Sequence, residues 1–255
     1  MTNSLVLETS DKSREIEQKI QEFFDKVNQV ISWVPWPASE LLGPIQDGME
    51  RLAQKMREFW DRVNQLFEQP GNSDRLREAG AQWAEDVGNI LGDIAGTVAL
   101  DKLQTNIEWT GRAAEAYKAT VPAQGEALNG LKDLAIEMRT SLDSLAESID
   151  NFWLAMKIAF VTFVVAIVGA IVAAATVVGI PAAIAVILTA VGVCLGVVTA
   201  TIMALDSHID TIHNQQTTIQ QKVRDVGTEW AKTNIAAMSD ASVTDGDGSD
   251  WRPQR

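Results

Sequence analysis

The sequence predicts an all-α protein, an elongated helical bundle with a hydrophobic helical hairpin at one tip. Apolar residues recur at three-and-four spacing through most of the 255 residues, and no convincing alternating strand pattern interrupts them. An uncharged run of 48 residues, rich in Val, Ala and Ile, extends from Ile158 to Leu205 and is divided by Gly179-Ile180-Pro181. Because about 20 apolar residues cross a bilayer, Ile158–Val178 and Ala182–Leu205 are each long enough to span one.

Two helices are predicted in the first segment, residues 1–72. Ser10 or Asp11 can cap the first helix, which we expect to continue to about residue 32 before a Trp- and Pro-rich stretch stops it. A Gly43-Pro44 turn precedes the second helix, which is expected from about residue 45 to about residue 67.

These two helices are an internal duplication. Residues 18–29 match residues 54–65 at a constant offset of 36, with eight of the 12 positions identical. Two copies are too few for a solenoid, so we expect a pair of amphipathic helices with matching aromatic faces. We expect these faces to cover the hydrophobic hairpin through Phe23, Phe24, Phe59 and Trp60.

The second segment, residues 73–157, is predicted to be a helical hairpin. Ser73 or Asp74 can cap its first helix after the Pro70-Gly71 break, and the chain turns at Trp109-Thr110-Gly111. Kinks are expected at Pro122 and Gly125. The first helix carries an apolar stripe of Leu76, Trp83, Val87, Ile90, Ile94 and Val98; the second carries a seam of Leu131, Leu134, Met138, Leu142, Leu145, Ile149 and Phe152.

The seam continues without a breaker into the hydrophobic hairpin, residues 158–205, so one continuous rod is expected there. A returning helix is predicted over residues 206–238 and should pack antiparallel on the seam. Residues 239–255 form an acidic tail of disordered composition. The apolar residues of the returning helix are Ile209, Ile212, Ile219, Val223, Val226 and Trp230.

The stretch from Trp109 to Tyr117 carries the most specific motif of the chain. It resembles the Trp-x-Gly (WXG) family of type VII (ESX) secretion substrates, in which a helical hairpin turns at W-x-G and continues A-A-x-A-[FY]. Gly111 can adopt the positive φ of a tight turn, and Trp109 can cover the open end of the hairpin. Alanines allow close helix approach. The motif residues are Trp109, Gly111, Ala113, Ala114, Ala116 and Tyr117.

This resemblance implies export through a type VII system with a helical secretion partner or chaperone. The N-terminal residues have neither the basic region nor the apolar region of a signal peptide, in agreement with that route. One family element is missing, because Y-x-x-x-[DE] would require an acidic residue four positions after Tyr117, where Val121 stands.

The hairpin itself predicts membrane contact. Gly179 and Pro181 form its turn, and the glycines at 169, 192 and 196 predict close helix packing, either within the hairpin or in a homo-oligomer. The architecture, though no motif, also resembles α-helical pore-forming toxins of the haemolysin and enterotoxin group. Because the run has no charged residue, a pore would be lined by Thr162, Thr176, Thr189, Thr199 and Thr201.

Composition argues against other classes. A net charge of −13 argues against nucleic-acid binding, and Cys194 as the lone cysteine excludes a disulfide within the chain. His208 and His213, five residues apart, do not share a helix face as a metal pair would. With no nucleophile motif or phosphate loop, we expect no enzyme activity, no cofactor and no metal site.

The sequence thus leads to a secreted or envelope-associated WXG-like protein that inserts into or docks at membrane lipid, as a pore-forming or effector component. Two alternatives remain open at this point. One is a resident, integral two-span membrane protein that scaffolds helices on one side. The other is a soluble helical targeting module for a toxin.

Overall fold

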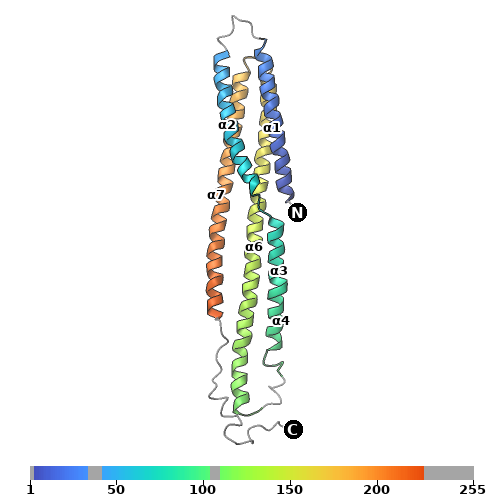
Figure 1. Ribbon diagram of the computed structural model, residues 1–255, viewed down its shortest axis with the longest axis vertical. Helices are drawn as coiled ribbons and strands as arrows, with labels where there is room; N and C mark the ends of the chain where they lie inside the picture. The colour runs from blue at the N-terminus through green and yellow to red at the C-terminus, as the bar shows by residue number, and fades with distance from the viewer. Residues whose placement is uncertain (1–2, 34–41, 104–109, 227–255) are drawn as a thin grey trace. The chain divides into compact units, whose positions relative to one another are not determined.

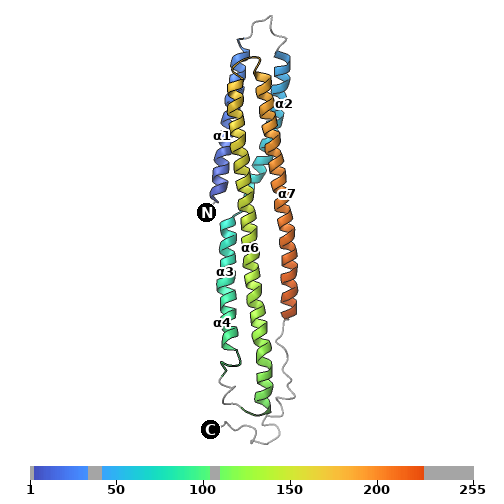
Figure 2. The same ribbon diagram turned by 180° about the vertical axis from the view of Figure 1, so that it is seen from behind.

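A computed structural model describes residues 3–33, 42–103 and 110–226, which are mostly helical and include no strand (Figures 1 and 2). The predicted all-α class is confirmed. Two compact units form, unit 1 from Met1–Asp74 and Leu145–Ile209 and unit 2 from Arg75–Ser144 and Asp210–Arg255. The helices are α1 (Ser4–Ile31), α2 (Leu42–Glu68), α3 (Ser73–Gln82), the π-helical η2 (Trp83–Asn89), α4 (Ile90–Thr97), α6 (Arg112–Ala173) and α7 (Ile180–Val226).

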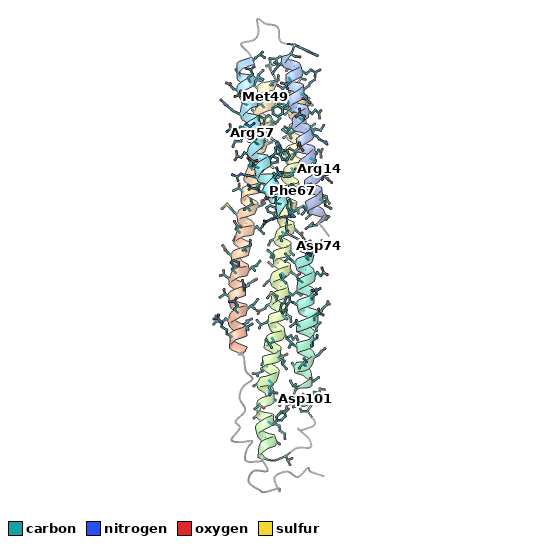
Figure 3. The ribbon with its side chains drawn as sticks, viewed as in Figure 1. Arg14, Met49, Arg57, Phe67, Asp74 and Asp101 are labelled. Carbon is teal, nitrogen blue, oxygen red and sulfur yellow. The ribbon has the colours of Figure 1, made fainter. Side chains whose placement is uncertain are left out.

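Unit 1 packs α1 and α2 against the apolar parts of α6 and α7, with buried residues of all four helices in one hydrophobic core. The Phe59 ring of α2 lies 5.7 Å from the Phe160 ring and 5.5 Å from the Phe163 ring, both on α6. The charged side chains of α1 and α2 face outward, as Arg14 and Arg57 do in Figure 3. The prediction that the duplicated helices cover the hairpin is confirmed.

The duplication is visible in the packing. Phe23 and Phe59, which are equivalent at the offset of 36, are both fully buried, as are Val27 and Val63. Equivalent ion pairs also recur on the outer surface, with Lys19 Nζ 2.6 Å from Glu22 Oε2 and Lys55 Nζ 2.7 Å from Glu58 Oε2. The repeated sequence therefore presents the same apolar face to the hairpin twice.

Three predicted helix starts were wrong. Helix α1 begins at Ser4, because the Oδ1 atom of Asn3 accepts a hydrogen bond from the Leu5 amide at 2.9 Å and caps the helix. Helix α2 begins at Leu42, so Gly43-Pro44 lies in its first turn and not before it. Proline is tolerated there because the first turn has no intrahelical partner for its missing N–H. Helix α3 begins at Ser73 itself, so the predicted cap at Ser73 or Asp74 lies one or two residues too late.

In unit 2, α3, η2 and α4 pack on α6 through small residues. A Cβ added at Gly88 would lie 3.4 Å from Ala135 Cβ, and one added at Gly80 would lie 3.3 Å from the Arg139 carbonyl oxygen. Of the predicted apolar stripe, Leu76, Val87 and Val98 are half-buried, whereas Trp83, Ile90 and Ile94 are exposed. Small side chains let the helices approach more closely than the large ones would, and the buried positions include Gly80, Ala84, Gly88 and Ala95.

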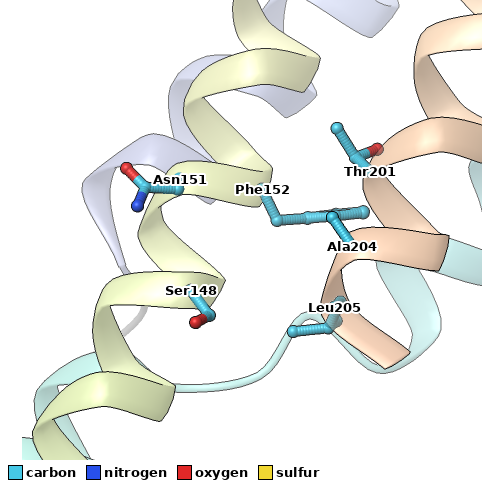
Figure 4. Close-up of a pocket in the computed structure, with 6 residues that line it drawn as sticks. All are labelled: Ser148, Asn151, Phe152, Thr201, Ala204 and Leu205. Atoms are coloured by element: carbon cyan, nitrogen blue, oxygen red, sulfur yellow. The ribbon is translucent and has the colours of Figure 1, made fainter. Parts of the chain in front are cut away.

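Helix α6 passes through Pro122 as one helix of 62 residues, which confirms the predicted continuous rod. Helix α7 returns antiparallel: in unit 2 the Ser141 hydroxyl donates to Gln215 Oε1 at 2.8 Å, and Lys222 pairs with Glu137. In unit 1 the Phe152 ring points at Ala204 in a pocket that is also lined by Ser148, Asn151, Thr201 and Leu205 (Figure 4). Trp230 and the predicted acidic tail lie outside the described residues.

Candidate functional site

The turn of the hydrophobic hairpin is built around Gly179. A Cβ at this position would lie 2.0 Å from the Ala173 carbonyl oxygen, so only glycine fits without a shift of the backbone. The Gly179 amide donates to the Thr176 carbonyl oxygen at 3.0 Å and lies 3.2 Å from Thr176 Oγ1. Pro181 follows as the second residue of α7, where its missing N–H leaves no helix hydrogen bond unmade. The predicted turn residues therefore lie at the turn.

The hairpin is covered on one side only. The most apolar windows of α6 and α7 are long enough to cross a membrane, yet only 33% and 39% of their residues are buried. Val165 on α6 is 66% exposed and Val193 on α7 is 60% exposed. The large apolar side chains exposed on these helices are Ile136, Leu154, Ile158, Val161, Val165, Val168, Val172, Val186, Val193, Met203, Ile209 and Val223.

A groove of about 410 Å³ runs between α6 and α7 on the uncovered side, lined by apolar side chains and one threonine. Its lining includes Ile158 and Thr162 of α6 and Val193 and Val197 of α7. Residues three, four and seven positions apart share a helix face, so Val161, Val165, Val168, Gly169 and Val172 continue this surface along α6 and Val186 continues it along α7. We call these ten residues the open face; the open face contains no charged residue.

The threonines of the hairpin keep their hydroxyls within their own helices. Thr162 Oγ1 donates to the Ile158 carbonyl oxygen at 2.9 Å, and Thr189 Oγ1 donates to the Ala185 carbonyl oxygen at 2.8 Å. A hydroxyl bonded to its own helix leaves no donor that must find water, so these residues can be removed from water at little cost. The same pattern holds for Thr199 and Thr201, whose hydroxyls bond to Leu195 and Val197.

The three predicted packing glycines point away from the core. A Cβ at Gly169, Gly192 or Gly196 would meet no heavy atom within 4 Å, and all three residues are exposed. These glycines therefore do not hold α6 and α7 together within the chain. Ala170 and Ala174, in contrast, are buried in the core of unit 1.

A buried polar cluster ties the start of α1 to α6. Asn3 Nδ2 donates to Asp150 Oδ1 at 2.5 Å and to Ser73 Oγ at 2.7 Å, and Ser73 Oγ donates to the same Asp150 oxygen at 2.6 Å. Nearby, Glu8 of α1 pairs with Lys157 of α6. Sequence reasoning missed this cluster, because its members are 70 and 147 positions apart and no local pattern connects them.

The predicted Trp-x-Gly turn is described in part. Gly111 has a φ of 105°, which confirms the predicted left-handed turn conformation. Ala114 is fully buried and Tyr117 is half-buried at the start of α6. Trp109 and the side chains of Ala113 and Ala116 lie outside the described residues.

Two ionisable groups of the described residues have shifted pKa values: burial raises the pKa of the Cys194 thiol to about 12, and a surface ion pair acts on Glu58. The pKa of the exposed Glu58 carboxyl is lowered because Lys55 donates a hydrogen bond to it, with the charges of Lys55 and Arg62 adding to the effect. Within the described residues no three metal-ligating side chains come together. The His208 side chain lies outside that set, and His213 is exposed.

Comparison with protein-family models, with characterised proteins and with solved structures found no match for this chain. Function must therefore be inferred from the half-covered hairpin and from the Trp-x-Gly motif. The helices themselves establish that the chain has two segments long and apolar enough to cross a membrane.

Proposed function

We propose that this protein binds a membrane through its hydrophobic hairpin and inserts the hairpin there, as a WXG-like protein exported by a type VII system. The observation that carries the membrane part is the one-sided cover of the hairpin, because α1 and α2 leave the open face free of charge and in contact with solvent. The export part rests on the resemblance of residues 109–117 to the family motif. We propose no catalytic step.

The exposed apolar area is large enough to favour lipid. Ile158, Val165, Val172 and Val193 are each exposed by more than half. With about 150–200 Å² for a fully exposed side chain of this size, burying the exposed parts of these four in lipid contributes on the order of 10 kcal/mol before the cost of immobilisation. Docking through the open face requires no rearrangement of unit 1.

Full insertion requires more, because the face under α1 and α2 must also meet lipid. The residues of α6 and α7 that α1 and α2 cover are apolar. They can therefore replace their contacts with α1 and α2 by contacts with lipid without bringing a charge into the membrane. Docking on the open face would therefore come first, and departure of α1 and α2 would follow.

The test is flotation of the full chain with phosphatidylcholine vesicles, which carry no net charge and so report apolar binding. Val165→Glu places a charge on the open face, while Gln18→Glu places the same charge at an exposed site on α1. We expect wild type and Gln18→Glu to float with the vesicles and Val165→Glu to lose at least about 10-fold in affinity, since a buried carboxylate opposes transfer to lipid. Equal flotation of both variants would remove the open face from membrane binding.

Two further measurements distinguish a pore former, a docking or targeting module and a resident membrane protein. Release of a dye trapped in the vesicles would identify a pore former, and binding without release would identify a docking or targeting module. Fractionation of producing cells with and without the type VII ATPase tests export. Retention in the membrane fraction regardless of the ATPase would identify a resident two-span protein and contradict export.

A further inference from the structure

We propose that in water, without lipid, the open face is occupied by the open face of a second copy of this chain, which gives a closed two-fold dimer. This inference does not rest on membrane binding, because it concerns the protein in the absence of lipid. The occupant is inferred from the size, the polarity and the shape of the face.

The apolar surface is too large to stay in water on a monomer. The seven large apolar side chains of the open face, Ile158, Val161, Val165, Val168, Val172, Val186 and Val193, are 39% to 73% exposed and, at about 150–200 Å² for full exposure, add up to on the order of 700 Å². The largest apolar patch of a typical monomer is about 300–600 Å². A stable interface buries about 800 Å² on each partner, so the area available on one copy matches what a dimer needs.

The polarity of the face selects an apolar partner. No charged residue lies between Ile158 and Leu205, and the hydroxyls of Thr162 and Thr189 are already bonded within their helices. A charged or polar partner would lose its hydration against this face without compensation. The acidic residues that give the chain its net charge of −13 lie outside the hairpin, so two copies can meet there without burying like charges.

The shape of the face allows it to pair with itself. Ile158 and Val165 rise beside a groove of about 410 Å³ that separates them from Val193 and Val197. In a two-fold dimer, α6 of the first copy packs against the groove and α7 of the second copy. By symmetry, α6 of the second copy packs in the same way on the first. Gly169, with open space around its Cβ position, allows close approach at this point. A two-fold contact covers the open face of both copies, so association ends at the dimer, whereas a head-to-tail contact would continue into filaments.

The C-terminal residues of the same chain are a poorer match for the face. Residues 239–255 contain Asp240, Asp245, Asp247 and Asp250, whose charges would have to be buried or held at the rim. A partner protein would have to supply an uncharged apolar surface of the same size, and the open face of a second copy is such a surface.

The experiment is sedimentation equilibrium of the full chain without detergent or lipid, at a series of protein concentrations. We expect a dimer of twice the 27.8 kDa chain mass that dissociates on dilution. Val193→Glu, at a site 60% exposed within the chain, should weaken dimerisation at least about 30-fold, because each copy would bury an unpaired carboxylate against the apolar α6 of the other. Gln18→Glu is the control with the same charge change, and circular dichroism checks that both variants stay helical.

Three results would overturn the inference. The first is a wild-type monomer at all concentrations up to tens of micromolar, which would also be the result if the chain's own C-terminal residues covered the face. The second is a Val193→Glu variant that dimerises like the control. The third is open-ended aggregation of the wild type, because a two-fold pair leaves no apolar face to grow from. Failure of vesicle binding with dimerisation intact would contradict the proposed function alone.

Discussion

Replacement of Phe59 by alanine tests whether the duplicated helices hold the hairpin by packing. The Phe59 ring is fully buried, and three rings surround it, those of Trp60 at 4.9 Å, Phe163 at 5.5 Å and Phe160 at 5.7 Å. Loss of the ring removes apolar burial and leaves a cavity between α2 and α6 that rigid helices fill only in part. Phe→Ala changes of this kind cost about 3–5 kcal/mol.

The assay is urea denaturation followed by circular dichroism, with a dye that binds exposed apolar surface as a second readout. We expect the free energy of unfolding of Phe59→Ala to fall by about 3–5 kcal/mol and dye binding to rise before unfolding, because α2 loosens from the hairpin. Trp33→Ala removes a larger ring that is 76% exposed and should change stability by less than about 0.5 kcal/mol. A loss below about 1 kcal/mol at Phe59 would refute the reasoning, since a ring enclosed by three others cannot be removed so cheaply.

The remaining predictions concern the polar cluster and the turn. Asp150→Ala removes the carboxylate oxygen to which both Asn3 and Ser73 donate. The free energy of unfolding, measured by thermal denaturation, should therefore fall by about 2–4 kcal/mol. An unchanged melting temperature would mean that water replaces the carboxylate. Gly179→Ala forces a Cβ against the backbone of the turn and should destabilise the chain by about 1–3 kcal/mol in the same assay. Gly192→Ala is its matched control and should be neutral or stabilising by up to about 1 kcal/mol, because its Cβ meets open space within a helix; equal losses at both glycines would contradict the described turn.

Much of unit 1 could be predicted because its patterns are local. The offset of 36 between Phe23 and Phe59 indicates two equivalent helices, and the apolar run with Gly179 indicates a hairpin. The sequence could not show which side of the hairpin is covered, because its helices are apolar all round and periodicity distinguishes faces only where polar residues mark one of them.

Unit 2 shows a different limit of the same reasoning. The apolar stripe of α3, η2 and α4 does not indicate that Trp83 and Ile90 are exposed, because apolar size usually drives burial. Close approach to α6 places the small Gly80 and Gly88 at the contact, since a short distance between backbones brings more atoms into contact than large side chains held apart. The spacing of apolar residues along one helix carries no information about its distance from another helix.

The duplication gives the cover of the hairpin two halves that are held by different chemistry. Both α1 and α2 contribute equivalent apolar residues, but α1 is also tied to α6 through its cap residue Asn3, which donates to Asp150, and through the ion pair of Glu8 with Lys157. Lipid or detergent competes with apolar contacts and leaves buried hydrogen bonds in place. For the proposed uncovering of the hairpin at a lipid surface, we therefore expect two steps, in which α2 leaves first and α1 stays attached as a tether at the base of the hairpin.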